Sequence, residues 1–116
     1  MDYLPIFLNI REQRCLVVGG GEVATRKATM LMRAGARVQV VAPEIAPALS
    51  EKLSKHEGHY RKGGYETADL NDVAIVIAAT DDEALNRRVY EDCRVRQLPV
   101  NVVDAPALCS FIFPSI

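Results

Sequence analysis

Short apolar runs alternate with longer amphipathic segments along this chain of 116 residues. A strand that is covered on both faces is apolar throughout, whereas a covering helix is apolar on one side, so the alternation is typical of a parallel sheet with crossover helices. We expect strands at Leu4–Ile10, Arg14–Val18, Arg37–Ala42, Gly58–Lys62, Val73–Ala79, Leu98–Val103 and Ser110–Phe113. We expect helices at Glu22–Ala34, at Ile45–Lys55 and from Asp81 or Asp82 to about Arg96. The pattern predicts one α/β domain over residues 1–116, a Rossmann-type, doubly wound, mostly parallel sheet with helices on both faces.

The expected strands differ in character. Leu4–Ile10 fits either a strand or one half of a hairpin. Gly58–Lys62 is polar, as an edge strand can be, whereas Val73–Ala79 is strongly apolar and belongs in the middle of the sheet. Gly35 is a natural stop for the first helix. Pro43 ends the strand expected at Arg37–Ala42.

A glycine-rich turn follows the second apolar run. Residues Val17 to Ala24, VVGGGEVA, match the pattern G-x-G-x-x-A between a buried strand and a helix. Gly19 permits the tight turn, Gly21 lets the backbone approach a pyrophosphate, and Ala24 lets the helix pack closely on the strand. The helix N-terminus adds free N–H groups and the positive end of its dipole. The segment therefore predicts that Gly19, Gly20 and Gly21 bind the pyrophosphate of a dinucleotide; the alternative is a flexible turn without a ligand. A P-loop is excluded because no Gly-Lys-Ser/Thr follows.

The acidic residue that commonly binds the ribose is absent from its usual place, about 20 residues after the turn. The strand there ends in Val41-Ala42-Pro43, and Glu44 comes slightly late. No arginine stands there to meet a 2′-phosphate, so the sequence favours NAD over NADP. Glu44 has an alternative role as an exposed residue in the first turn of the next helix.

Two other strand ends carry polar groups. In an open α/β sheet, ligands lie outside the carboxyl ends of the strands. Thr80 follows the central strand and is placed to hydrogen-bond a ribose or a nicotinamide, although the aspartates after it fit helix capping. Asp104 leaves a second apolar strand towards the expected position of a nicotinamide. An aspartate before Ala-Pro is also a common turn former, and that alternative stays open.

Composition points to no nucleic-acid or membrane partner. The formal net charge is −1, with 49% hydrophobic and 25% charged residues. The chain lacks the basic start and apolar run of a signal peptide, and no stretch approaches a membrane span. Cys15, Cys93 and Cys109 form no Cys-x-x-Cys pair, so we expect reduced thiols in a cytoplasmic protein. His56 and His59 have no evident third ligand beside them, and we predict no metal site.

Several strings of residues together resemble one known family. They are Leu4 to Leu8, LPIFL; Cys15 to Ala24, CLVVGGGEVA, with Arg26 to Ala28, RKA; Gly35 to Arg37, GAR; Ala78 to Asp82, AATDD; Asn101 to Pro106, NVVDAP; and Ser110 to Ser115, SFIFPS. In this order they closely resemble the N-terminal domain of siroheme synthases, the precorrin-2 dehydrogenase/sirohydrochlorin ferrochelatase module. The resemblance covers essentially the whole chain, and its last two strings are far more specific than the glycines.

The resemblance implies a reaction and a set of site residues. The family oxidises precorrin-2 to sirohydrochlorin with NAD⁺ and then inserts Fe²⁺ to make siroheme. Its cofactor contacts would fall on Gly21, Glu22, Val23, Pro43 and Glu44. Its essential aspartate would be Asp104, which is suited to take a proton beside the nicotinamide and protons from pyrrole nitrogens during metal insertion. The tetrapyrrole itself would ligate the metal, so no permanent protein metal site is required.

The family continues past the end of this chain with a dimerisation region and a helical segment, and often with a methyltransferase domain. The chain ends at Ile116 and resembles a fragment that is incomplete for catalysis, with a homodimer expected for the full-length protein. Two other classes share a glycine turn. A dinucleotide-sensing regulatory domain gives no reason for Asp104, and an S-adenosylmethionine-dependent methyltransferase favours an acid at the end of the second strand, which is absent here.

Overall fold

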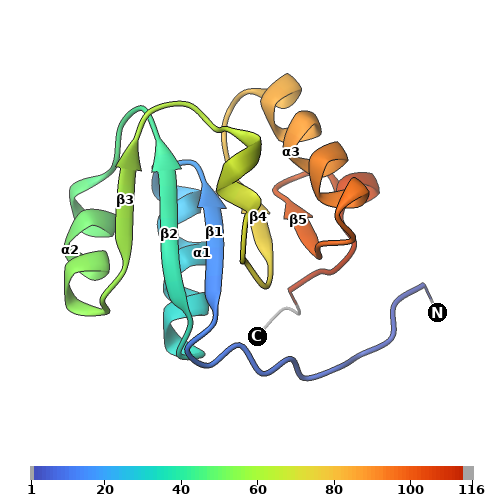
Figure 1. Cartoon of the computed structure of the whole chain (residues 1–116), viewed down its shortest axis with the longest axis horizontal. Coiled ribbons are helices and arrows are strands. Elements are labelled where there is room, and N and C mark those ends of the chain that lie inside the picture. Colours follow the sequence, from blue (N-terminus) through green and yellow to red (C-terminus); the bar gives the residue numbers. More distant parts are fainter. Residues whose placement is uncertain (1, 114–116) are drawn as a thin grey trace.

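A computed structural model describes residues 2–113, which form one parallel five-stranded sheet with helices on both faces (Figure 1). The strands are β1 (Arg14–Val18), β2 (Arg37–Ala42), β3 (His59–Lys62), β4 (Val76–Ala78) and β5 (Val100–Val102). The helices are α1 (Glu22–Arg33), α2 (Pro47–Lys55) and α3 (Glu83–Val95), with short 3₁₀ turns η1 (Thr67–Leu70) and η2 (Pro106–Leu108). The predicted Rossmann-type fold is confirmed.

In the strand order β3-β2-β1-β4-β5, β2 and β3 are added on one side of β1 and β4 and β5 on the other, so the order reverses at β1. After β3 the chain crosses over β1 and adds β4 on its other side, with Val17 paired to Val40 on one side and to Ile77 on the other. All neighbouring strands are parallel, so their carboxyl ends meet at one edge of the sheet. That edge, above β1, is where doubly wound sheets bind ligands.

Alternation along β1 divides the interior into two cores. Cys15 and Val17 pack towards α1 and α2, and Leu16 and Val18 pack towards α3 and η1. Both faces of β1 are therefore buried, as its unbroken apolar run predicts. Each fully buried valine or leucine contributes about 1.5–3 kcal/mol of hydrophobic free energy, so this strand anchors the turn that follows it.

The helix boundaries follow local chemistry. In α1, Ala24 and Ala28 lie on the buried stripe, and their small side chains bring the helix close to the sheet. Helix α2 begins at Pro47 rather than at Ile45, because proline is favoured at the first helical position, where no N–H is needed. Asp82 caps α3 by accepting a hydrogen bond from the Leu85 N–H at 3.1 Å.

Two expected strands are absent from the described residues, and the first is Leu4–Ile10. This segment is irregular and mostly exposed, with Leu4 81% exposed, and only Ile10 is buried in the core. An apolar run forms a strand only when another strand offers it backbone partners. The described residues provide none here, so neither the strand nor the hairpin forms.

The second absent strand is Ser110–Phe113, which does lie beside β5 but is not paired to it as a strand. One backbone bond joins the two segments, from the Ser110 N–H to the Val100 carbonyl at 2.8 Å, and side chains make further contacts in place of a full ladder. The Val100 N–H donates to Ser110 Oγ at 2.8 Å and the Val102 N–H to Cys109 Sγ at 3.2 Å. Polar side chains thus satisfy the outer edge of the sheet. Of the SFIFPS string, Pro114 and Ser115 lie outside the described residues.

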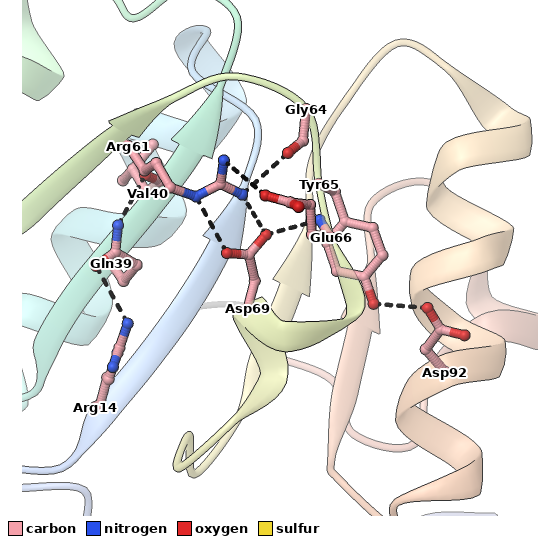
Figure 2. A network of polar contacts seen from close by, with 9 residues as sticks. All are labelled: Arg14, Gln39, Val40, Arg61, Gly64, Tyr65, Glu66, Asp69 and Asp92. Atoms are coloured by element: carbon pink, nitrogen blue, oxygen red, sulfur yellow. Dashed lines mark hydrogen bonds and ion pairs between the residues drawn. The ribbon is translucent and has the colours of Figure 1, made fainter.

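A polar network holds the crossover between β3 and β4 (Figure 2). Arg61 of β3 forms ion pairs with Asp69 and Glu66, and the Tyr65 hydroxyl donates to Asp92 of α3 at 2.8 Å. Burial of Tyr65, together with this bond to a carboxylate, raises the pKa of its hydroxyl above the ordinary range. The network fixes the connection that carries the chain across the top of the sheet. No described helix has the length and apolarity needed to cross a bilayer.

Candidate dinucleotide-binding site

A cavity of about 430 Å³ opens at the carboxyl edge of the sheet, above the point where the strand order reverses. Its walls come from the β1–α1 turn, the end of β2 and the end of β4. The structure brings together every residue predicted to bind the cofactor: Gly19, Gly20, Gly21, Glu22, Val23, Pro43, Glu44 and Thr80. Ala42, Ala79 and Asp81 complete the lining.

Gly19 and Gly20 are required by the protein's own backbone. Gly19 has φ +129°, and a Cβ on it would lie 2.2 Å from the carbonyl oxygen of Ala79. A Cβ on Gly20 would lie 2.1 Å from the carbonyl oxygen of Glu44. These two glycines let the ends of β4 and β2 close against the turn, a requirement that holds with or without a ligand.

Gly21 differs from its two neighbours. Its backbone is extended, with φ −90° and ψ −158°, so any residue could adopt it. A Cβ there would meet no atom of the protein within 4 Å, because it would project into open space. Gly21 is exposed and lines the cavity. Nothing within the described protein requires glycine at this position, whereas a ligand that approaches the backbone would require it.

The first turn of α1 leaves its N–H groups available. Gly21 is the N-cap residue, and no side chain caps this helix. Thr25 donates both its N–H and its hydroxyl to the Gly21 carbonyl, at 3.0 and 2.8 Å, which fixes the start of the helix. Uncapped N–H groups and the helix dipole favour an anion at this end. The arrangement is suited to a pyrophosphate beside Gly21.

The wall at the end of β2 is held by the neighbouring strand β3 and the residue after it. The Ala42 carbonyl accepts hydrogen bonds from the Tyr60 hydroxyl at 2.9 Å and from the Gly63 N–H at 3.0 Å. Glu44 is exposed and lies in the loop before α2, so its alternative role as a first-turn helix residue is wrong. The residues that line the cavity include no arginine or lysine that would meet a 2′-phosphate.

Thr80 lies on the opposite wall and is already hydrogen-bonded within the protein. Its hydroxyl lies 2.6 Å from Oδ1 of Asn86 and accepts from the Asp82 N–H at 3.2 Å. Asn86, on α3, is 6% exposed. Sequence reasoning missed this asparagine, although a signal exists: it is a polar residue on the stripe of α3 that also buries Val89 and Cys93.

Asp104 lies in the turn after β5, at the carboxyl edge of the sheet, but it does not line the cavity. It is exposed and has φ +58°, a left-handed conformation that aspartate and asparagine tolerate better than most residues. The Val103 N–H donates to the Ala78 carbonyl at 3.0 Å, which ties the turn to the end of β4. The backbone therefore gives Asp104 a turn-forming role, and its predicted catalytic role stays a prediction.

The remaining candidates lie elsewhere. Cys15 and Cys93 are buried in the cores, and burial raises the pKa of Cys15 to about 11 and that of Cys93 to about 12. His56 and His59 are exposed on either side of the turn between α2 and β3. Residues 2–113 contain no group of three His, Cys, Asp or Glu side chains arranged to hold a metal ion.

This fold, with its cavity at the glycine turn, defines a dinucleotide-binding domain of the Rossmann class. A family model described as putative NAD(P)-binding matches residues 6–115, and the chain belongs to that family.

Named relatives agree with this assignment. A siroheme synthase of Pseudomonas fluorescens (strain Pf0-1) is 56% identical over 116 residues, which is 100% of this chain and 25% of the relative. A siroheme synthase of Methylobacillus flagellatus is 50% identical with the same coverage. The chain thus spans about a quarter of the length of these curated relatives. The resemblance to the N-terminal domain of siroheme synthases is confirmed.

Solved structures extend the comparison. SirC, a precorrin-2 dehydrogenase, is 30% identical and superposes with a TM-score of 0.77 over 98% of this chain and 53% of that one. A D-lactate dehydrogenase with NAD⁺ from Lactobacillus jensenii has a TM-score of 0.53 at 11% identity, over 96% of this chain and 40% of that one. The second match shows the fold alone.

Proposed function

We propose that this chain is the NAD⁺-binding domain of an enzyme that oxidises precorrin-2 to sirohydrochlorin. The observation that carries the proposal is Gly21, which lines the cavity and which no contact within the described protein requires to be glycine. The relatives supply the substrate class, since they include siroheme synthases and a precorrin-2 dehydrogenase.

The cavity residues divide the work of binding. Gly21, Glu22 and Val23 would hold the pyrophosphate through the N-terminal N–H groups of α1, and Pro43 and Glu44 would face the adenosine ribose. Glu44 is suited to accept hydrogen bonds from ribose hydroxyls and would repel a 2′-phosphate, which favours NAD⁺ over NADP⁺. NAD⁺, when bound, accepts the hydride that leaves the tetrapyrrole.

Asp104 is our candidate for the residue that takes the accompanying proton. It is an exposed carboxylate, and its turn is tied to the end of β4, next to the cavity wall formed by Ala79 and Thr80. A carboxylate within reach of a carbon–hydrogen or nitrogen–hydrogen bond can act as a general base. We assign only the oxidation to this chain and place iron insertion, with Fe²⁺ as substrate, in another domain of the full-length protein.

Absorbance spectroscopy tests the proposal directly. Precorrin-2 and NAD⁺ are mixed with this chain or with the full-length protein, and the formation of NADH and of sirohydrochlorin is recorded. We expect turnover by the full-length protein and weak turnover by the 116-residue chain, because a tetrapyrrole needs more surface than this open edge offers. No NADH formation by the full-length protein would refute the proposal, and a dinucleotide-sensing role would replace it if NAD⁺ still bound.

A further inference from the structure

Asn86 forms three hydrogen bonds with a single residue of the cavity wall, Thr80. Its Nδ2 donates to the Thr80 carbonyl at 3.0 Å, and its Oδ1 accepts from the Thr80 hydroxyl at 2.6 Å and from the Thr80 N–H at 3.4 Å. The partners determine the orientation of the amide, because its nitrogen faces a carbonyl and its oxygen faces two donors. We propose that Asn86 is a positioning residue for the dinucleotide site and acts through Thr80.

The Asn86 amide is buried, so its hydrogen bonds to Thr80 cannot be replaced easily by water. Asn86 is 6% exposed on a helix stripe whose other members are apolar, so its amide has little access to water. A buried amide is tolerated where its hydrogen-bonding groups are paired, and here one residue supplies all the partners. The amide therefore holds the N–H, the carbonyl and the side chain of Thr80 in one arrangement.

The arrangement reaches the glycine turn through one more residue. Ala79 precedes Thr80, and its N–H donates to the Val18 carbonyl at 2.8 Å. The Ala79 carbonyl oxygen lies so close to Gly19 that a Cβ on Gly19 would be only 2.2 Å from it. Asn86 thus holds the residue that directly follows the contact between the end of β4 and the turn.

The same bonds decide which hydrogen bond Thr80 can offer to a ligand. Its hydroxyl has one proton and two acceptors within reach, Asn86 Oδ1 at 2.6 Å and the Asp82 carbonyl at 3.2 Å, and the shorter contact takes the proton. The hydroxyl oxygen already accepts from the Asp82 N–H at 3.2 Å. One acceptor position remains on the hydroxyl oxygen. Thr80 therefore binds a hydrogen-bond donor of the dinucleotide, either a ribose hydroxyl or the carboxamide NH₂ of the nicotinamide. This inference rests on the proposed NAD⁺ site.

The test measures NAD⁺ affinity and melting temperature of Asn86→Ala, with Asn101→Ala as the matched control. Asn101 is 7% exposed, and its amide donates to the Phe111 carbonyl at 3.1 Å. We expect NAD⁺ binding about tenfold weaker in Asn86→Ala, equivalent to about 1.4 kcal/mol, and unchanged in Asn101→Ala. Equal NAD⁺ affinity in wild type and folded Asn86→Ala would overturn the inference, whereas a wild type that binds no NAD⁺ would overturn the proposed function itself.

Thr80→Val keeps the test decisive if Asn86→Ala does not fold, because Thr80 is only half-buried. We expect a similar loss of NAD⁺ affinity in Thr80→Val and recovery in Thr80→Ser, which keeps the hydroxyl. Where both single variants fold, Asn86→Ala with Thr80→Val should bind no more weakly than either single variant. Fully additive losses would refute action through Thr80. The affinity of Thr80→Val for ADP-ribose, which lacks the nicotinamide, identifies the donor. A loss of affinity as large as that for NAD⁺ identifies a ribose hydroxyl, and no loss identifies the carboxamide.

Discussion

Gly21→Ala should separate ligand binding from folding more cleanly than any other change at this site. The added methyl group meets no protein atom within 4 Å, and the backbone there is already extended. Replacing glycine where the backbone suits other residues stabilises a protein by about 0.4–1 kcal/mol. The loss of glycine at an uncapped N-cap costs about as much. These effects offset one another, so the melting temperature should hardly change.

Binding should respond differently, because the methyl group projects into the space beside the N–H groups of α1. A pyrophosphate displaced from that position loses one or two hydrogen bonds to a charged group, each worth roughly 1.5–3 kcal/mol. We therefore expect NAD⁺ affinity to fall at least tenfold in Gly21→Ala, and binding to vanish in Gly21→Asp, which adds charge repulsion. Isothermal titration calorimetry measures the affinity, and circular dichroism measures the melting temperature.

Two other glycines serve as controls. Gly64 is also exposed and also has no atom within 4 Å of its Cβ position, yet it does not line the cavity and caps no helix. Gly64→Ala should therefore leave NAD⁺ affinity unchanged and should raise the melting temperature slightly. Gly20→Ala places a Cβ 2.1 Å from a backbone carbonyl and should lower stability by about 1–3 kcal/mol or more. A folded Gly21→Ala protein that binds NAD⁺ like the wild type would refute the assignment of the pyrophosphate.

Four further predictions concern the cofactor, the base and the thiols. NAD⁺ should bind more tightly than NADP⁺ in parallel titrations, because no basic side chain lines the cavity; a preference for NADP⁺ would contradict our reading of Glu44. In the full-length protein, Asp104→Asn keeps the left-handed turn and should reduce the oxidation rate by about 10²- to 10⁴-fold with NAD⁺ affinity unchanged, whereas wild-type turnover would leave only the turn-forming role. At pH 8 a thiol reagent should modify Cys109 first, because Cys15 and Cys93 are buried with raised pKa values. Rapid labelling of Cys15 and Cys93 in the folded protein would contradict their burial. The raised pKa values also favour the neutral thiols of the folded state, so the free energy of unfolding should begin to fall above about pH 9 and should continue to fall towards pH 11.

Local features of the sequence were enough to predict the centre of the fold. The apolar run of β1, the glycines after it and the small residues of α1 each identify their own structure, because a strand buried on both faces, a tight turn and a close-packed helix impose requirements on neighbouring residues. The residues that we expect to bind the cofactor were predicted from the same patterns and from the family resemblance. The carboxyl ends of parallel strands meet at one edge of the sheet, and all of these predicted residues line the cavity at that edge.

Contacts between distant residues decided the rest. Leu4–Ile10 has the composition of a strand but finds no strand partner among the described residues. Ser110 bonds Val100 of β5 through one backbone N–H and its hydroxyl, without forming a strand. The clash that makes Gly20 a glycine comes from the backbone of Glu44, 24 residues further along the chain, and the amide that holds Thr80 comes from the next helix. The periodicity of apolar residues in the sequence predicts which face of a helix or strand is buried. Which atoms meet across that face depends on how the elements pack, and only the tertiary structure determines this packing.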